Sequence, residues 1–179
     1  QGLAARGACN AHAGMKIVSE LPAHRPAVLE LNRLAFKGDA EARLIKNLHQ
    51  DGAILASFVA VDGDVVVGHI LFSPLYVMAD GERVDAAALA PMCVVPSRQK
   101  QGIGTRLVEH GIEAMKAAVH EAIIVLGHVN FYPRFGFRHD LAMNLSCAFN
   151  KYDAFMGLEP RAGSLGGKSG TCTYPRAFA

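Results

Sequence analysis

Two glycines spaced by one residue follow a short basic turn at residues 99–105. An apolar segment ends just before this turn, at Pro96, and apolar residues recur at helical spacing after it. The N–H groups at the start of a helix have no intrahelical partner and carry positive partial charge, so they bind anions. Gly102 and Gly104 lack a Cβ atom and let a ligand approach the backbone closely. The stretch therefore predicts a binding site for a diphosphate group.

The charge of the turn agrees with this prediction, because Arg98 and Lys100 are basic and no acidic residue competes for the N–H groups. A dinucleotide fingerprint does not fit, since Leu107 occupies the position of the third glycine. A second glycine-rich string, residues 162–169, loosely resembles a phosphate loop, but no helix is predicted after it. An ordinary tight turn that binds nothing remains the alternative for residues 99–105.

A second segment, residues 130–137, combines polar and aromatic side chains. Asn130 and Tyr132 lie just beyond a predicted strand, at the end where open α/β sheets bind ligands. Phe135 and Phe137 are expected to be core anchors instead. The segment therefore predicts ligand contacts for Asn130 and Tyr132.

The elements that position these residues follow from hydrophobic periodicity and turn residues. A strand at residues 16–21 precedes two helices, and Asp39 is expected to cap the second one. An antiparallel meander of three strands leads into the glycine turn and its helix. A parallel strand follows that helix, and further strands are predicted near the C-terminus. The predicted strands after the second helix are residues 54–61, 65–78, 84–95, 122–126, 143–149, 154–158 and 171–174.

The composition is that of a globular protein with one sizeable core, with 179 residues, 51% of them hydrophobic. Residues 1–14 are interpreted as an N-terminal extension or a cloning remnant, and residues 15–179 as one domain. A net charge of +2 with scattered basic residues argues against nucleic acid as a partner, and no apolar run approaches the ~20 residues that span a bilayer. Cys93 and Cys147 lie in apolar runs, which indicates buried free thiols. We expect a cytoplasmic protein without a metal site.

The glycine turn and the aromatic segment together resemble the signatures of the GNAT acetyltransferases. Residues 99–104 match the Q/R-x-x-G-x-G/A pattern of that family, and Tyr132 with Gly136-Phe137 matches its tyrosine segment. Residues 126–137, with Ala154-Phe155-Met156 and the tail, look like the YhbS-type predicted N-acetyltransferases. The resemblance covers about residues 15–178. It implies a mixed α/β fold, in which a mostly antiparallel sheet contains a splayed parallel strand pair and is flanked by helices.

The resemblance also implies roles for individual residues. Backbone groups of Met92 and Val94 would bind the acetyl-pantetheine arm of acetyl-CoA, and the Met92 N–H would polarise the thioester carbonyl. Asn130 would contact the pantetheine, and Tyr132 would act as general acid toward the leaving thiolate. The diphosphate would be bound by Gln99, Lys100, Gln101, Gly102, Ile103, Gly104 and Thr105. No metal is implied.

The general base is the least determined part of the prediction. Glu41 opens the second helix, which borders the acceptor site in the family, but a carboxylate there is also favoured by the helix dipole alone. His69 and His128 are further candidates, although a histidine on an apolar strand is more often a hydrogen-bonded core residue. Ser73 could line the acceptor pocket or serve only the turn before Pro74.

The predicted activity is transfer of acetyl from acetyl-CoA to an amine by direct attack in a ternary complex. The acceptor amine could belong to a small molecule or to a protein, and a homodimer is compatible with the sequence. One alternative is a non-catalytic domain of the same fold that binds acyl-CoA as a sensor or scaffold. The other is an unrelated structural protein whose glycine turn binds nothing.

Overall fold

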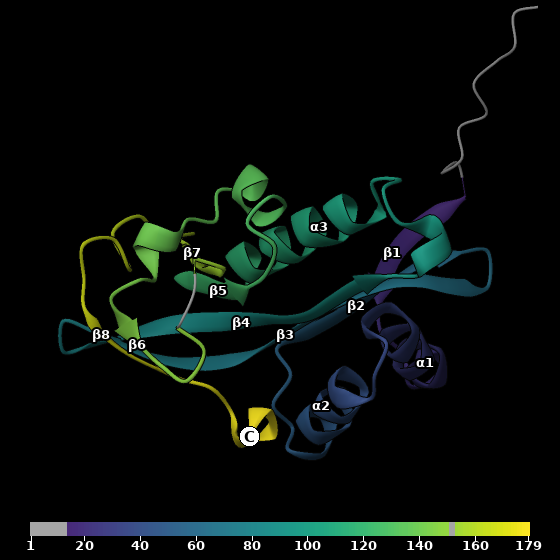
Figure 1. Cartoon of the computed structure of the whole chain (residues 1–179), viewed down its shortest axis with the longest axis horizontal. Helices are drawn as coiled ribbons and strands as arrows, with labels where there is room; N and C mark the ends of the chain where they lie inside the picture. The colour runs from purple at the N-terminus through teal and green to yellow at the C-terminus, as the bar shows by residue number, and fades with distance from the viewer. Residues whose placement is uncertain (1–13, 151–152) are drawn as a thin grey trace, which may run out of the picture.

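The computed structural model describes residues 14–150 and 153–179, whose strands form one eight-stranded mixed sheet (Figure 1). The predicted extension, apart from Gly14, lies outside the described residues. The strand order is β1-β2-β3-β4-β5-β7, and β8 pairs with both β3 and β6. The strands are β1 (Met15–Ser19), β2 (Ala56–Asp62), β3 (Val65–Ala79), β4 (Glu82–Val94), β5 (Ala122–Leu126), β6 (Leu145–Ser146), β7 (Phe155–Leu158) and β8 (Gly170–Thr173).

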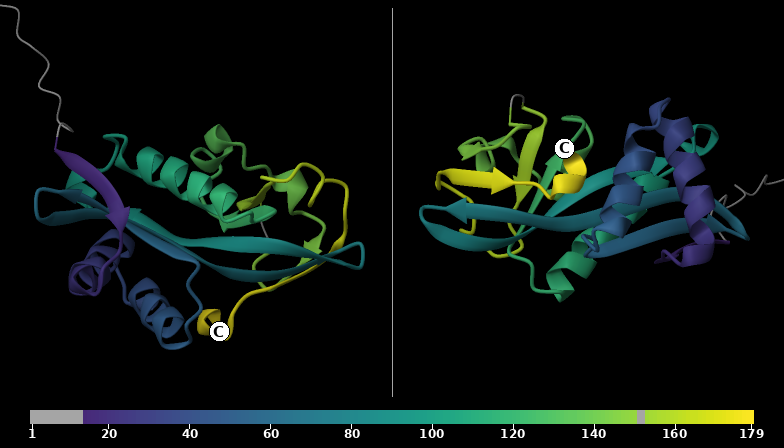
Figure 2. Two further views of the ribbon diagram at one scale, coloured as in Figure 1. Left: turned by 180° about the vertical axis from the view of Figure 1, so that it is seen from behind. Right: turned by 90° about the horizontal axis from the view of Figure 1, so that it is seen from below.

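Helices cover both faces of the sheet. The first two, α1 (Arg25–Phe36) and α2 (Ala40–Gln50), lie together on one face, and α3 (Ile103–Ala117) crosses the other (Figures 1 and 2). The C-terminal turn lies beside α2, and its Ala177 packs against Ile45 and Leu48 of that helix. The short 3₁₀ helices are η1 (Pro22–His24), η2 (Pro96–Arg98), η3 (Tyr132–Phe135), η4 (His139–Leu141) and η5 (Arg176–Phe178).

The predicted meander is present as β2, β3 and β4, joined by tight turns. Gly63 and Gly81 have positive φ values in these turns, which glycine adopts without steric cost. On one sheet face, α3 packs closely because β3 and α3 each supply a glycine at the contact. A Cβ on Gly111 would lie 2.4 Å from the Phe72 ring, and one on Gly68 would lie 2.8 Å from Leu107. This packing holds the N-terminus of α3 against the sheet.

The parallel strand pair separates where β4 bends. Pairing with β5 covers Ala86–Leu89, whereas β4 continues to Val94 along β3. The register of β3 with β4 shifts between Ile70 and Phe72, and the irregularity contains Pro91, which has no N–H to donate. A β-bulge bends its strand and increases the local twist. The bend turns the end of β4 away from β5, and the predicted fold class with its splayed pair is confirmed.

Three local predictions are wrong. The predicted strand over residues 143–149 is reduced to Leu145–Ser146, because the Asn150 side-chain amide binds nearby backbone carbonyls, including that of Met143 (3.0 Å). Asp39 lies at the N-cap of α2, but its carboxylate accepts a hydrogen bond from Arg33 (2.7 Å) instead of capping the helix. Cys147 is only half-buried.

The glycine-rich string at residues 162–169 is not a phosphate loop. No helix follows it, and β8 begins directly at Gly170. The N–H groups of Leu165 and Gly166 donate to the Glu159 carboxylate at 2.7 and 2.5 Å. A side chain of the protein therefore binds the N–H groups that a phosphate would need.

Candidate active site

The site is centred on the gap that opens between β4 and β5. The Val95 N–H donates to Val67 on β3 (2.9 Å). Because backbone groups alternate in direction along a strand, those of Met92 and Val94 point to the opposite edge, where β5 has diverged. The Val94 carbonyl accepts a hydrogen bond from the Gln99 side chain (3.1 Å). An extended ligand in the gap could pair with this edge as an added strand.

The glycine turn lies at one end of this gap. Gly102 is the N-cap of α3 with φ +84°, and Lys100 also has a positive φ of 60°. The first intrahelical hydrogen bond joins the Arg106 N–H to the Gly102 carbonyl (3.1 Å). The N–H groups of the three residues between them, 103–105, therefore point out of the helix end. This geometry suits an anion and agrees with the prediction from the sequence.

The sequence suggested that Arg98 adds positive charge to the turn, but the structure pairs its guanidinium with other side chains. Its guanidinium binds Asp62 at the end of β2 (2.9 Å) and the Gln101 side-chain carbonyl (3.1 Å). These contacts fix the shape of the turn. Lys100 is exposed and is the basic residue at this position that faces solvent.

Gly104 lies on the side of α3 that faces the gap. A Cβ at this position would lie 3.6 Å from the Phe131 ring, 3.7 Å from Val94 and 3.8 Å from Met92. The first turn of α3, the end of β4 and the segment after β5 therefore meet at one point. Phe131 is a contact that sequence reasoning missed, because only the polar residues of its segment drew attention.

Tyr132 is buried beside the gap, on η3. Its N–H donates to the His128 carbonyl (3.2 Å), and its ring lies so close to Gly127 that a Cβ there would approach within 2.2 Å. Burial raises the pKa of the phenol, and the nearby Cys93 thiol adds to this effect. A raised pKa keeps the hydroxyl protonated at neutral pH. Asn130 is exposed on the same connector, where its carbonyl accepts a hydrogen bond from Arg134 (3.2 Å).

Glu41 approaches the same place from the other side. It is half-buried in the first turn of α2. Burial raises the pKa of the Cys93 thiol to about 12, and the charge of Glu41 contributes. Cys93 is therefore within electrostatic range of Glu41 and, separately, of Tyr132. The sequence indicated Cys93 only as a buried thiol, and its central position depends on tertiary packing.

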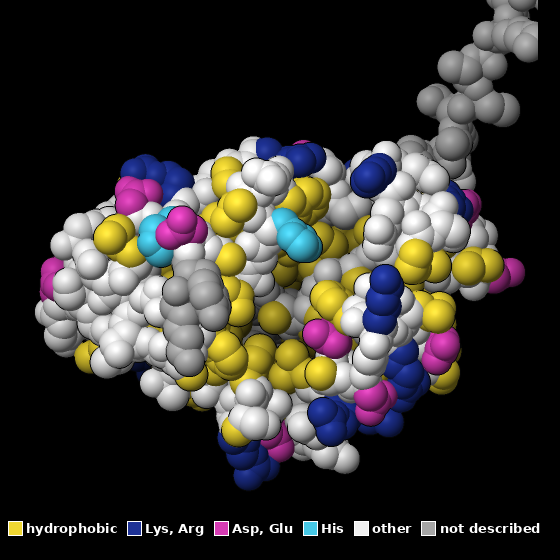
Figure 3. All heavy atoms as spheres, in the orientation of Figure 1, with side chains coloured by type: hydrophobic (Ala, Val, Ile, Leu, Met, Phe, Trp, Pro, Cys, Tyr) yellow, Lys and Arg dark blue, Asp and Glu magenta, His cyan; other side chains and the backbone are white. Residues whose placement is uncertain are grey.

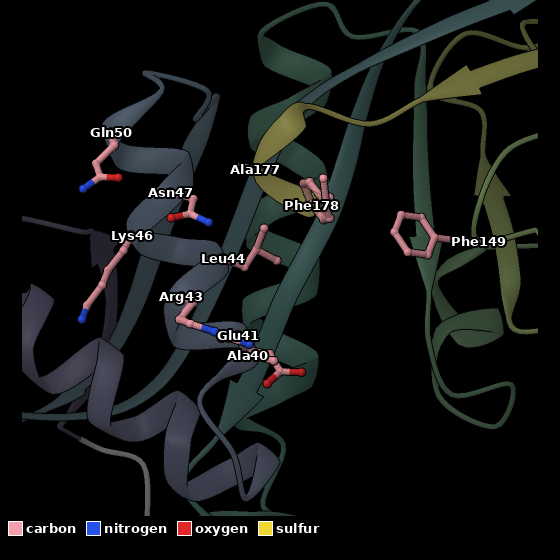
Figure 4. A pocket seen from close by; sticks show the side chains of 11 residues that line it. Ala40, Glu41, Arg43, Leu44, Lys46, Asn47, Gln50, Phe149, Ala177 and Phe178 are labelled. Atoms are coloured by element: carbon pink, nitrogen blue, oxygen red, sulfur yellow. The ribbon is translucent and has the colours of Figure 1, made fainter.

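A groove of about 540 Å³ lies over α2 and has Glu41 in its lining. It is bounded by α2 and the C-terminal turn on one side and by Phe149 on the other, and Glu41 lies at its edge (Figure 4). Figure 3 shows a hollow with a largely hydrophobic floor on the same face of the molecule. The groove combines one acidic side chain, Glu41, with the basic Arg43 and Lys46 and with the apolar residues Leu44, Phe149 and Phe178.

The two histidines considered as general base and the pocket candidate Ser73 differ in burial and hydrogen bonding. His69 is fully buried and bonded within a polar cluster, with Ser57 Oγ at 3.0 Å from Nε2 and Asn32 Nδ2 at 3.3 Å from Nδ1. His128 is exposed on the connector after β5. Ser73 is fully buried, and among the described residues its hydroxyl has no hydrogen-bond partner. His69 therefore fits the alternative of a hydrogen-bonded core residue.

Comparison with known proteins identifies the family. The sequence profile of the acetyltransferase (GNAT) family matches residues 25–137, which include the glycine turn and the tyrosine segment. The chain belongs to the GNAT family. It is also 31% identical over 166 residues to the uncharacterised N-acetyltransferase YhbS of Escherichia coli, covering 92% of this chain and 98% of YhbS. The resemblance inferred from the sequence is confirmed.

Two solved GNAT structures that resemble this chain contain CoA or acetyl-CoA. The Escherichia coli YhbS structure in complex with CoA matches with a TM-score of 0.84, covering 92% of this chain and 91% of that one. A GNAT acetyltransferase from Brucella melitensis in complex with acetyl-CoA matches with a TM-score of 0.75 and 27% identity, covering 92% and 98% of the two chains. Membership in this family supports an acyl-CoA-dependent transferase.

The described residues contain neither a candidate metal site nor a helix that could cross a membrane. In residues 14–150 and 153–179, no group of three or more His, Cys, Asp or Glu side chains is arranged to hold a metal ion. Within the same ranges, none of the helices has the length and apolar character needed to cross a membrane.

Proposed function

We propose that this GNAT protein transfers the acetyl group of acetyl-CoA to an amine by direct attack, with no covalent acyl-enzyme. The observation that carries the proposal is the open backbone edge at the end of β4, where the first turn of α3 and Phe131 of the connector meet it. Tyr132, the next residue of that connector, would supply a protonated phenol, and Glu41 of α2 would supply a carboxylate. Acetyl transfer to an amine requires one group that accepts a proton and one that donates it.

The residues of the gap fit acetyl-CoA. The backbone edge at Met92 and Val94 would pair with the pantetheine arm, and Asn130 would contact it from the connector. The N-terminus of α3 and the turn would bind the diphosphate, through Gln99, Lys100, Gln101, Gly102, Ile103, Gly104 and Thr105. When bound, acetyl-CoA supplies an activated thioester, and the protein supplies alignment of the two reactants.

Each catalytic role answers a specific energetic need. An alkylamine has a pKa near 10.4, so removing its proton at pH 7 costs about 4.6 kcal/mol. Glu41 would accept this proton at the edge of the groove. The Met92 N–H would stabilise the negative charge that develops on the thioester oxygen. Tyr132 would donate its proton to the leaving sulfur, and its raised pKa ensures that the proton is present.

The groove beside α2 is the proposed entry for the acceptor. Its apolar residues suit a carbon framework, and Glu41 at its edge, beside the basic Arg43 and Lys46, would be the carboxylate that receives the amine. Both a small-molecule amine and the side chain or N-terminus of a protein could reach it, because the groove is open to the surface (Figure 3).

Two measurements test the proposal. Adding CoA should raise the midpoint of thermal unfolding, because binding to the native state stabilises it by mass action. Incubation with acetyl-CoA and a panel of primary amines should then release free CoA thiol. Absence of any thermal shift at high CoA would reject the cofactor site. A clear shift without thiol release for any amine would instead indicate a non-catalytic acyl-CoA-binding domain.

A further inference from the structure

Two cysteine side chains outside the proposed catalytic centre face each other across a pair of strands. Strands β6 and β8 are parallel, with Leu145 opposite Gly170 and Ser146 opposite Thr171. Continuing this register by one residue places Cys147 opposite Cys172. Both cysteines are free thiols, and Cys147 packs against the apolar cluster that contains Cys172.

The two thiols differ in their access to solvent. Cys172 is 4% exposed and is fixed in the sheet opposite Val77 of β3. Cys147 is half-buried and lies at the end of β6, where its sulfur accepts a hydrogen bond from the Phe149 N–H (3.4 Å). A small oxidant from solution therefore reaches Cys147 first.

The pair lies directly behind one wall of the groove. Phe149 and Tyr174 follow the two cysteines by two residues each, and their rings pack edge to face with centroids 4.9 Å apart. Tyr174 also packs against Phe178, with centroids 4.9 Å apart. Figure 4 shows Phe149 across the groove from Leu44 and Phe178. A link between the cysteines would thus fix the segment that carries Phe149.

We propose that Cys147 and Cys172 form a reversible disulfide that braces the Phe149 wall of the groove, and that its oxidant is a low-molecular-weight disulfide such as oxidised glutathione. Residues directly opposite on neighbouring strands fall within the Cα separations that a disulfide spans. The site itself is independent of the proposed activity. Only its effect on the acceptor rests on the proposed function.

The exchange balances in two steps. The Cys147 thiolate attacks one sulfur of glutathione disulfide, forms a mixed disulfide and releases one glutathione thiolate, which takes up a proton. The Cys172 thiolate then attacks the Cys147 sulfur, closes the protein disulfide and releases the second glutathione. Two protein thiols are oxidised and one glutathione disulfide is reduced to two thiols. Burial raises the pKa of Cys172, so the second step is expected to accelerate as the pH rises.

Peptide mapping tests the site on the full chain. After incubation with glutathione disulfide, free thiols are alkylated and the protein is digested with trypsin. Every cysteine lies in a different tryptic peptide, so a link between residues 139–151 and 169–176 can be recognised without ambiguity. We expect this cross-linked pair, lighter by two hydrogens than its separate peptides and lost on reduction. Cys9→Ser should retain the link, whereas Cys147→Ser should abolish it.

Two further measurements test the brace. The midpoint of thermal unfolding should be higher by about 5 °C or more in the oxidised form, since the link lowers the conformational entropy of the unfolded chain. Its residues 143–150 should exchange their amide hydrogens more slowly than in the reduced form. With an amine that the enzyme acetylates, oxidation should change KM for the amine at least twofold and leave KM for acetyl-CoA unaltered.

The possible outcomes separate the claims. A stable mixed disulfide at Cys147 with Cys172 still alkylated would overturn the proposed site. A correct link without slower exchange or an altered amine KM would overturn the brace. If no amine is acetylated, the proposed function fails, while the mapping and exchange results still decide the disulfide and its effect on the wall.

Discussion

Tyr132 and Glu41 owe their positions to their neighbours more than to their own side chains. Tyr132 packs on the bare backbone of Gly127, where a Cβ would come within 2.2 Å of its ring. Glu41 is carried by the first turn of α2, whose helix dipole favours a carboxylate. Both lie near the buried Cys93 thiol. Their proposed roles can therefore be tested one at a time.

Replacing Tyr132 with Phe removes the proposed proton donor and keeps the ring that fills the space beside Gly127. We expect kcat to fall at least about tenfold, because the thiolate then leaves without general acid assistance. The affinity for CoA, measured by thermal shift, should not change. Tyr76→Phe is the matched control, since Tyr76 is 56% exposed on β3. Normal turnover in Tyr132→Phe would exclude the acid role.

Replacing Glu41 with Gln keeps the size of the side chain and removes its charge. We expect kcat/KM for the amine to fall about 10- to 100-fold, because the variant can neither attract the ammonium group nor accept its proton. Steady-state kinetics with both substrates measure this effect, and KM for acetyl-CoA should remain unchanged. Glu109→Gln on the exposed side of α3 serves as control. Equal loss in both variants would argue against a specific role of Glu41.

At the scale of elements, the turn between β4 and α3 combines a special backbone geometry with a proposed binding role. Gly102 has φ +84°, and no atom lies within 4 Å of the position of an added Cβ. A larger side chain there meets no steric obstacle. Any effect of substitution must therefore arise from the backbone, whose N–H groups are the proposed diphosphate ligands.

Gly102→Val tests the turn because valine disfavours a positive φ by about 1–2 kcal/mol. We expect the Kd for CoA to rise about tenfold as the N–H groups shift from their positions. Isothermal titration with CoA measures the change. Gly63→Val is the matched control, since Gly63 has φ +60° and equally open surroundings in the β2–β3 turn. A similar Kd in both variants would contradict the proposed diphosphate site.

At the scale of the whole molecule, a buried polar cluster joins the sheet to both helices on its face. Glu20, just after β1, has a 2% exposed side chain and accepts hydrogen bonds from Ser57 of β2 and Arg25 of α1. Its carboxylate also lies 3.6 Å from His69 of β3 and 3.5 Å from His49 of α2. The sequence showed these residues as unrelated positions.

The cluster predicts a specific loss of stability in acid. Burial alone would raise the pKa of Glu20, but the nearby His69 and the hydrogen bond from Ser57 outweigh it and lower the pKa from 4.5 to about 2. The charged form therefore stabilises the fold above about pH 4.5, and this contribution disappears as the pH falls toward 2. It corresponds to about 3 kcal/mol at pH 7.

Urea unfolding of Glu20→Gln measures this contribution. We expect the variant to lose about 3 kcal/mol of the free energy of unfolding at pH 7 and to differ less from the native protein at pH 3. Glu82→Gln, at an exposed position of β4, should stay within about 0.5 kcal/mol of the native protein at both values. If the variant lost the same free energy of unfolding at pH 7 and at pH 3, the charge of Glu20 would not be the cause of the loss.

Much of the fold followed from local patterns. The meander was predictable because Gly63 and Gly81 mark tight turns between β-rich runs, and α3 because its apolar residues recur with helical period. The true length of the strand within residues 143–149 was not predictable, because the Asn150 amide that shortens it acts through hydrogen bonds formed only in the folded chain. The Asp39 cap failed for a similar reason, since Arg33 binds the carboxylate.

The sequence by itself determined the family, the position of the glycine turn and the choice of Tyr132 as a candidate site residue, because each depends on residue types at fixed short spacings. Tertiary structure alone decided that Glu41 and Tyr132 each come within electrostatic range of Cys93, and that Cys147 packs beside Cys172. These pairs come from segments far apart in the chain. Their proximity results from helix and strand packing across the sheet, which no local spacing encodes.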